Sequence, residues 1–192
     1  MGLDFRTFRR EIINRRYERM ENGDIYIPVA RVRIGGVFEH EVIRDGESLG
    51  VYRDHNIVVN QGLNSLLDIM FHGSTQITSW YVGIFEGNYT PLATDTAANI
   101  TANSTECTAY DEATRVAYDE AAASGQAITN SASKATFTMN ATKTVYGAFL
   151  ASASAKSATT GTLFSASKFS AARAVVDNDQ LLLTYTLSAS DA

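Results

Sequence analysis

The stretch from Val29 to Arg44 reads VARVRIGGVFEHEVIR, and through most of it apolar and polar residues alternate. This period of two is typical of a half-buried β-strand. Gly35-Gly36 in its middle is typical of a two-residue turn, so we expect a hairpin whose return strand is Val37 to Arg44. Asp45-Gly46 predicts a second turn, and a third apolar run from Leu49 to Val59 completes a meander. The body of the protein is therefore expected to begin with antiparallel strands.

The last third of the chain carries a similar alternation, although most of its residues are small. Between Ala121 and Ala192, 39 of 72 residues are Ala, Ser or Thr, and Phe, Val, Tyr and Leu alternate with them. Disorder would not require that alternation, so this segment is predicted to be β-structure. Asp177-Asn178-Asp179 predicts a turn, and the apolar residues from Leu181 to Leu187 define the buried face of the last strand. The strands expected here are 134–140, 144–151, 162–167, 171–176 and 180–188.

An internal helix is expected between the two strand regions. Asn60 is a candidate N-cap, the apolar residues from Leu63 to Met70 recur on one face, and Gly73 stands where a C-terminal cap belongs. After it, Trp80 alternates in phase with Val82 and is expected to face the core.

The elements together predict a mainly β fold, an antiparallel β-sandwich of jelly-roll-like type, with an N-terminal amphipathic helix and one internal helix. We divide the chain into an arm, residues 1–23, and a body, residues 24–192. Residues 86–131 are interpreted as a long loop region with one strand near Thr114 to Tyr118.

The arm is basic, whereas the rest of the chain is acidic. The first twenty residues carry six arginines and three acids, while the other 172 carry ten basic and eighteen acidic groups. A basic arm is attracted to acidic surfaces that its own acidic body would repel. Apolar residues at i, i+3 and i+7 predict that Leu3 to Met20 is an amphipathic helix ending near Asn22-Gly23. The residues expected to dock onto a partner are Phe5, Arg6, Phe8, Arg9, Arg10, Ile12, Arg15, Arg16, Tyr17 and Arg19.

Composition excludes several classes of protein. The net charge of −5 argues against a nucleic-acid binder, which needs a basic face to neutralise phosphates. A single cysteine, Cys107, cannot form an intrachain disulfide, which suits assembly in a reducing cytoplasm. No stretch reaches the ~18 apolar residues of a membrane span, and the arm lacks the apolar core of an export signal.

Catalytic and cofactor motifs were sought in the same sequence. His40, His55 and His72 have no metal-ligand spacing, and Glu39 and Glu41 would point away from His40 in a strand, so we expect structural or solvated histidines. The sequence contains no G-x-S-x-G turn, phosphate-binding loop or dinucleotide fingerprint. Cys107 lacks a basic neighbour that would stabilise its thiolate. We therefore expect no enzyme activity and no cofactor or metal.

A local repeat leaves two interpretations open. Ala-Tyr-Asp-Glu-Ala occurs at 109–113 and again at 117–121, with Arg115 between the copies. The acidic pairs could bind calcium, although they lack the glycine and the ligand spacing of an EF-hand loop. Alternatively they form a solvated or interface surface, with Arg115 bridging carboxylates of the same or a neighbouring subunit.

Several segments resemble a known group of proteins. His55 to Asp68, Trp80 to Phe85, Tyr146 to Leu150 and Asp179 to Leu187 look like small virion structural proteins of tailed bacteriophages. The resemblance spans about residues 40–190 and leaves the arm outside. It implies a head decoration, collar or tail-fibre component that is assembled in the host cytoplasm, and no functional residue carries over from it.

From the residues and the resemblance we expect a non-enzymatic homo-oligomeric virion protein whose arm docks onto capsid, neck or tail proteins. In a simpler alternative, the arm helix packs on its own sandwich. A second hypothesis is a carbohydrate-binding module of a phage tail appendage, and a third is an envelope hydrolase, which lacks a paired-carboxylate motif. The aromatic residues that would stack on sugars in the second hypothesis are Trp80, Tyr81, Tyr89, Tyr110 and Tyr118.

Overall fold

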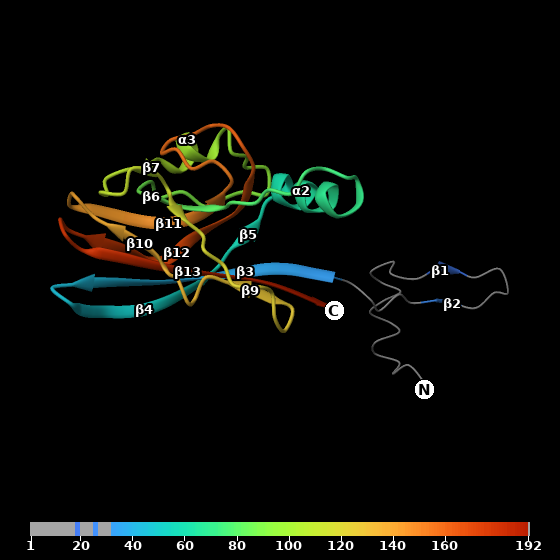
Figure 1. Cartoon of the computed structure of the whole chain (residues 1–192), viewed down its shortest axis with the longest axis horizontal. Coiled ribbons are helices and arrows are strands. Elements are labelled where there is room, and N and C mark those ends of the chain that lie inside the picture. Colours follow the sequence, from blue (N-terminus) through green and yellow to red (C-terminus); the bar gives the residue numbers. More distant parts are fainter. Residues whose placement is uncertain (1–17, 20–24, 27–31, 192) are drawn as a thin grey trace. The chain divides into compact units, whose positions relative to one another are not determined.

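The structure of the protein is a computed structural model (Figure 1). The residues that it describes are 18–19, 25–26 and 32–191. The chain divides into two compact units, residues 1–33 with 190–192 and residues 34–189. Most of the strands and both described helices belong to the second unit.

In the first unit, two short strands replace the end of the predicted arm helix. Strand β1 (Glu18–Arg19) pairs antiparallel with β2 (Ile25–Tyr26). The prediction of a helix as far as Met20 is therefore wrong at Glu18 and Arg19. Asn22-Gly23, which we interpreted as a helix end, falls in the sequence between these two paired strands. The rest of the predicted helix lies outside the described residues.

The first sheet of the larger unit is antiparallel and has five strands in the described part of the chain. Its order is β10-β13-β3-β4, and β9 also pairs with β13. The strands are β3 (Val32–Arg44), β4 (Glu47–His55), β9 (Ala127–Thr129), β10 (Ala135–Thr138) and β13 (Gln180–Asp191). The Asp45-Gly46 turn between β3 and β4 is confirmed, because both residues have positive φ, 51° and 82°.

Strand β3 runs unbroken through Gly35-Gly36, so the turn predicted there is wrong. A Cβ at Gly36 would lie 2.7 Å from the ring of Tyr185 and 2.8 Å from the carbonyl oxygen of Thr186. Glycine is needed here because β13 approaches closely, and not because the chain reverses. The alternation that follows is confirmed: Phe38, His40 and Val42 are buried on one face.

The second sheet is also antiparallel, with the order β5-β12-β11-β6-β7, and β8 pairs with β6. Its strands are β5 (Ile57–Val58), β6 (Tyr81–Phe85), β7 (Glu106–Cys107), β8 (Val116–Ala117), β11 (Lys143–Ala151) and β12 (Leu163–Val175). The fold is thus mainly β with antiparallel sheets, as predicted.

Strand β12 is continuous, whereas we predicted two strands here, 162–167 and 171–176. Val145 of β11 pairs with Arg173, whereas Gly147 pairs with Lys168, so two steps on β11 match five on β12. The extra residues form a bulge, which bends the strand without ending it. The bulge brings the backbone N–H of Ser170 to 2.8 Å from the carboxylate of Asp54 in β4.

Two helices are described, and one of them was not predicted. Helix α2 (Asn60–Phe71) matches the expected internal helix, although Asn60 is its first residue and not its cap, and Gly73 follows it with a φ of +73°. Helix α3 (Ile100–Ser104) lies in the region interpreted as a loop. The strand predicted near Thr114 to Tyr118 is confirmed by β8. Region 86–131 also contains β7 and β9, so the loop interpretation was too simple.

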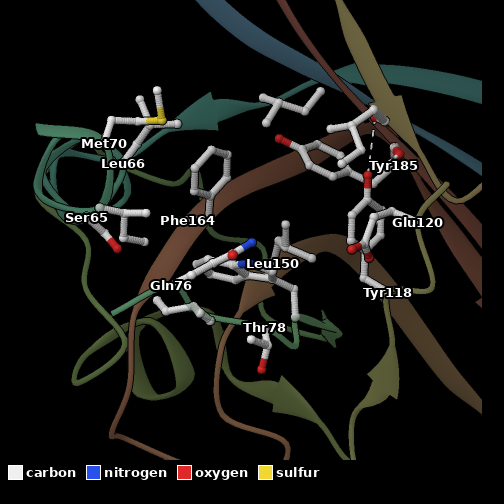
Figure 2. A pocket seen from close by; sticks show the side chains of 15 residues that line it. Ser65, Leu66, Met70, Gln76, Thr78, Tyr118, Glu120, Leu150, Phe164 and Tyr185 are labelled. Carbon is white, nitrogen blue, oxygen red and sulfur yellow. Dashed lines mark hydrogen bonds between the residues drawn. The ribbon is translucent and has the colours of Figure 1, made fainter. Parts of the chain in front are cut away.

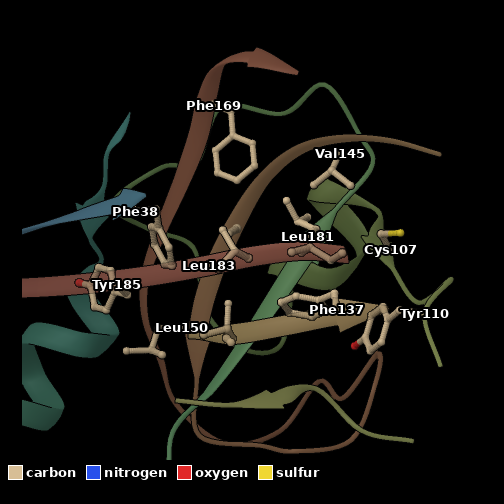
Figure 3. Packing of buried hydrophobic residues seen from close by; sticks show 14 of the residues in the cluster. Phe38, Cys107, Tyr110, Phe137, Val145, Leu150, Phe169, Leu181, Leu183 and Tyr185 are labelled. Atoms are coloured by element: carbon tan, nitrogen blue, oxygen red, sulfur yellow. The ribbon is translucent and has the colours of Figure 1, made fainter. Parts of the chain in front are cut away.

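Both sheets contribute to one hydrophobic cluster (Figure 3). Phe38, Leu181 and Leu183 come from the first sheet, and Val145 and Phe169 come from the second. Phe38 stacks on Tyr185 with 4.5 Å between the ring centroids. Every described member of the two core clusters lies within the larger unit.

Candidate functional site

A pocket of about 260 Å³ opens beside helix α2 and reaches down to the core (Figure 2). Leu66 and Met70 of α2 form one side of it, and Tyr118, Glu120 and Tyr185 lie on the opposite side. The other lining residues are Ser65, Ile69, Gln76, Ile77, Thr78, Trp80, Ile128, Leu150, Phe164 and Leu187. The site is therefore assembled from segments that are far apart in the sequence.

Close packing against β12 sets the position of α2, which carries four of the lining residues. Gly62 in its first turn lies against the backbone of Phe164, and a Cβ there would be 2.8 Å from the Cα of that residue. The N–H of Val59, just before the helix, donates to the carbonyl oxygen of Phe164 at 3.1 Å. Helix and strand thus meet at the start of α2, and the apolar side chains of later turns border the pocket.

Two aromatic rings form an apolar wall. Trp80 stands just before β6 and meets Phe164 edge to face, with 5.6 Å between their ring centroids. Trp80 is partly buried against the core cluster, as its phase with Val82 predicted. The carbonyl oxygen of Trp80 accepts a hydrogen bond of 2.8 Å from the N–H of Tyr118, which fixes the wall to the opposite side of the pocket.

The opposite wall holds two neutral phenols. The hydroxyl of Tyr118 donates to the carbonyl oxygen of Tyr185 at 3.1 Å (Figure 2). Burial raises the pKa of Tyr185 to about 12 and also raises the pKa of Tyr118. The side-chain amide of Asn56 donates to the hydroxyl of Tyr185 at 2.8 Å. Both phenols are therefore uncharged at neutral pH, and the hydroxyl of Tyr118 donates a hydrogen bond whereas that of Tyr185 accepts one.

Among the described residues that line the pocket, Glu120 is the only one with a charged side chain. It is exposed, so its carboxylate lies at the rim and not in the apolar interior. Met70, which lines the pocket, is exposed on α2, and so are Leu67 and Phe71, which do not line it. An apolar interior with an acidic rim suits an apolar group attached to a positive charge.

His40 forms a second cluster, which resembles part of a catalytic triad. Its Nε2 lies 2.9 Å from the carboxylate of Asp54, and its ring stacks on Phe169 with 3.7 Å between centroids. Burial lowers the pKa of His40, and the hydrogen bond to Asp54 opposes that effect. Its Nδ1 has no hydrogen-bond partner among the described residues, so no nucleophile there is aligned with it. The predicted structural role fits this packing.

Arg115, between the two acidic repeats, is buried and pairs with Glu106, which lies outside both copies of the repeat. Its guanidinium donates two hydrogen bonds to Glu106, at 2.8 and 2.7 Å, and both side chains are 1% exposed. Arg115 thus pairs with a carboxylate of the same subunit, as one interpretation expected, but it is buried and does not lie on a solvated surface. The repeat tyrosines Tyr110 and Tyr118 are buried as well, which removes both from the proposed sugar-stacking set.

Arg115 and Glu106 also form hydrogen bonds with the backbone. Arg115 donates to the carbonyl oxygens of Ala153 and Ala158, and the N–H of Ser157 donates to Glu106. The cluster fastens the 152–162 loop to β7 and β8, which is a structural role. Next to Glu106, burial raises the pKa of the Cys107 thiol, so this cysteine remains protonated.

The predicted docking residues lie almost entirely outside the described part of the chain. Arg19 is described and belongs to β1, opposite Ile25. The others, Phe5, Arg6, Phe8, Arg9, Arg10, Ile12, Arg15, Arg16 and Tyr17, fall on residues that the structure does not describe. Within the described ranges, no cluster of three His, Cys, Asp or Glu side chains could hold a metal ion. No helix among them is long and apolar enough to cross a bilayer.

The pocket was missed in the sequence analysis because its residues carry no shared motif. The signals that existed were the exposed apolar end of the predicted helix and Trp80 at the start of a strand. Comparison with known proteins finds no family model that matches the chain and no curated relative.

Proposed function

We propose that the chain is a non-enzymatic structural protein of a tailed-bacteriophage virion, assembled in the host cytoplasm. Its arm docks onto a neighbouring subunit of the head, neck or tail, and the body self-associates in a decoration, collar or fibre-anchoring role. The observation that carries this proposal is the charge opposition between an arm with six arginines and three acids and a body with an acidic excess.

The division of the chain supports a docking arm. Residues 34–189 form a unit of their own, and the described members of both core clusters fall inside it. We propose that the two antiparallel sheets of this unit pack face to face as a β-sandwich, since one cluster takes side chains from both. We propose that such a body forms its core without the arm, which leaves the arm available to a neighbour.

The test compares three versions of the chain during phage assembly: the wild type, a deletion of residues 1–23, and a full-length variant with its six arm arginines changed to Gln. Immunoblots of purified particles measure incorporation, and circular dichroism of the purified proteins measures folding. We expect both altered chains to fold and to be lost from particles by at least about tenfold, as 1.4 kcal/mol of lost docking energy would produce. If the deletion unfolds the body, or if both altered chains are incorporated normally, the docking role is refuted.

A further inference from the structure

We propose that the pocket beside α2 binds the N-terminal arm of a second copy of this chain. The inference rests on the proposed function, because it names the subunit onto which the arm docks. It follows from the shape of the pocket, the charge of its rim, the exposed apolar side chains of α2 and the reach of the arm.

The shape of the pocket suits aromatic side chains. An apolar cavity of ~150 Å³ is enough to take up benzene. The volume of about 260 Å³ therefore has room for one or two rings of that size. Trp80 and Phe164 offer an edge-to-face wall against which another ring can pack. In the arm, Phe5 and Phe8 are two rings only three residues apart.

The charge of the rim suits the rest of the arm. Glu120 at the rim is exposed, and Asp119 beside it is exposed as well. Arginines flank both phenylalanines of the arm, at Arg6 and at Arg9-Arg10. A planar guanidinium can pair with a carboxylate through two hydrogen bonds, so rings in the pocket would place cations at an acidic rim.

Helix α2, which forms one side of the pocket, also carries exposed apolar side chains that a second molecule could cover. Leu67, Met70 and Phe71 are 52%, 66% and 81% exposed, which puts three large apolar side chains within five residues of one helix. Of these three residues, Met70 also lines the pocket. Contiguous exposed apolar surface is typical of an interaction site. An inserted arm fills the pocket, and the neighbouring copy that supplies the arm covers the surface around it.

The larger unit, residues 34–189, begins next to the pocket. The hydroxyl of Ser188 donates to the carbonyl oxygen of Gly35 at 3.4 Å, and Gly36 lies against Tyr185, which lines the pocket. The 33 residues before Ile34 span at most roughly 110 Å when fully extended, which is ample to reach an adjacent molecule. Reciprocal exchange of arms between two copies would therefore occur near the point where each arm leaves its body.

The experiment uses two full-length variants that are each defective on one side of the contact. The arm variant is Phe5→Ala with Phe8→Ala and Ile12→Ala, and the pocket variant is Thr78→Arg with Glu120→Lys. Thr78 and Glu120 are exposed, so their replacement spares the core. Thr159→Arg with Glu47→Lys, at exposed positions that do not line this pocket, is the matched control.

Light scattering measures the molar mass of each chain alone and of an equimolar mixture of the two variants. We expect the wild type and the control to form oligomers, each variant alone to be monomeric, and the mixture to recover a complex of two chains. The recovery follows because one intact arm then meets one intact pocket. A monomeric mixture, or oligomers that neither variant weakens, overturns the inference.

Trp80 supplies a second readout because it is the only tryptophan in the chain and lines the pocket. In the wild type, acrylamide quenching of its fluorescence should rise at least twofold when the oligomer is diluted to monomers. In the arm variant, quenching should be high at every concentration. If Trp80 is shielded in the wild-type monomer, the arm occupies its own body and the exchange is refuted. Purified particles that still contain the protein would leave the proposed function standing.

Discussion

At the scale of single residues, the most consequential contact is the ion pair between Glu106 and Arg115. Both side chains are almost fully buried, and their charged groups hydrogen-bond to each other and to the backbone. A buried charge that loses its partner keeps the cost of desolvation without its compensation. The pair therefore matters far more than the exposed ion pairs elsewhere in the body.

Replacing Arg115 by Met should lower the free energy of unfolding by about 3–5 kcal/mol, because Glu106 would remain buried and unpaired. Arg53→Met is the matched control, since Arg53 is 74% exposed and pairs with Glu39 on the surface. That change should cost less than about 1 kcal/mol. Urea unfolding measures both. Equal effects of the two substitutions would show that the buried pair contributes no more to stability than an exposed pair.

The burial of His40 predicts a pH dependence of stability. Its pKa in the folded protein is lowered from the usual value, so the unfolded chain binds a proton first as the pH falls. The contribution of His40 to stability is therefore fully present above about pH 6.5 and is lost as the pH falls towards its folded pKa.

Between pH 7 and pH 5 the free energy of unfolding should decrease, by at most about 1.4 kcal/mol per pH unit from this group. His40→Gln should flatten that dependence, and His72→Gln, at an exposed position after α2, should leave it unchanged. Urea titrations at several pH values measure the slope. A slope that is the same in His40→Gln and the wild type would contradict this assignment.

Local sequence predicted some of these residue environments and not others. The alternation of Glu39, His40 and Glu41 was sufficient to bury the histidine, because side chains on a strand alternate between faces. The partner of Arg115 was not predictable, since the repeat offered nearer carboxylates than Glu106. Only the pairing of β7 with β6 and the return of the 152–162 loop bring that acid into range.

At the scale of elements, α2 shows how one residue positions a binding surface. Gly62 permits contact with the backbone of β12, and the helix in turn carries one side of the pocket. A larger side chain at that position would force the helix away from the strand.

Gly62→Ala should therefore destabilise the protein by about 1–3 kcal/mol, the usual cost of overpacking. Gly35→Ala serves as the control, because no described atom lies within 4 Å of a Cβ built there. Thermal unfolding measures both variants, and acrylamide quenching of Trp80 in Gly62→Ala reports the displaced helix. Unchanged stability and unchanged quenching would mean that α2 is not fixed through this glycine.

Elements with a pattern of their own were predictable, and elements defined by a distant partner were not. The last strand and α2 have long periodic patterns, and both were found close to their predicted ranges. Strand β7, which was not predicted, contains two residues and pairs with β6. The turn predicted at Gly35-Gly36 was wrong because glycine is equally suited to a turn and to close contact with another strand. The residue that approaches Gly36, Tyr185, lies far away in the sequence, so local sequence did not reveal the contact.

At the scale of the whole molecule, opposite charges on arm and body make assembly sensitive to salt. Charges at an exposed rim are screened beyond ~10 Å at 0.1 M salt and beyond ~3 Å at 1 M. Raising the salt concentration over that range should therefore weaken self-association several-fold, although the apolar contacts would persist.

Sedimentation of the full-length chain at increasing salt concentration measures this effect. The variant with six arm arginines changed to Gln should associate weakly throughout and show little salt dependence. Association of the wild type that strengthens with salt would indicate a purely apolar contact and would contradict the role of the arginines.

The central claim is that the protein is a structural part of a virion, and immunogold electron microscopy of purified particles tests it most directly. The antibody is raised against the full-length chain, and particles lacking the protein serve as the control. The account predicts gold at a fixed position: over the head for a decoration protein, or at the neck or tail for a collar or fibre-anchoring protein. Particles without label, while the protein is abundant in the same lysate, would contradict it.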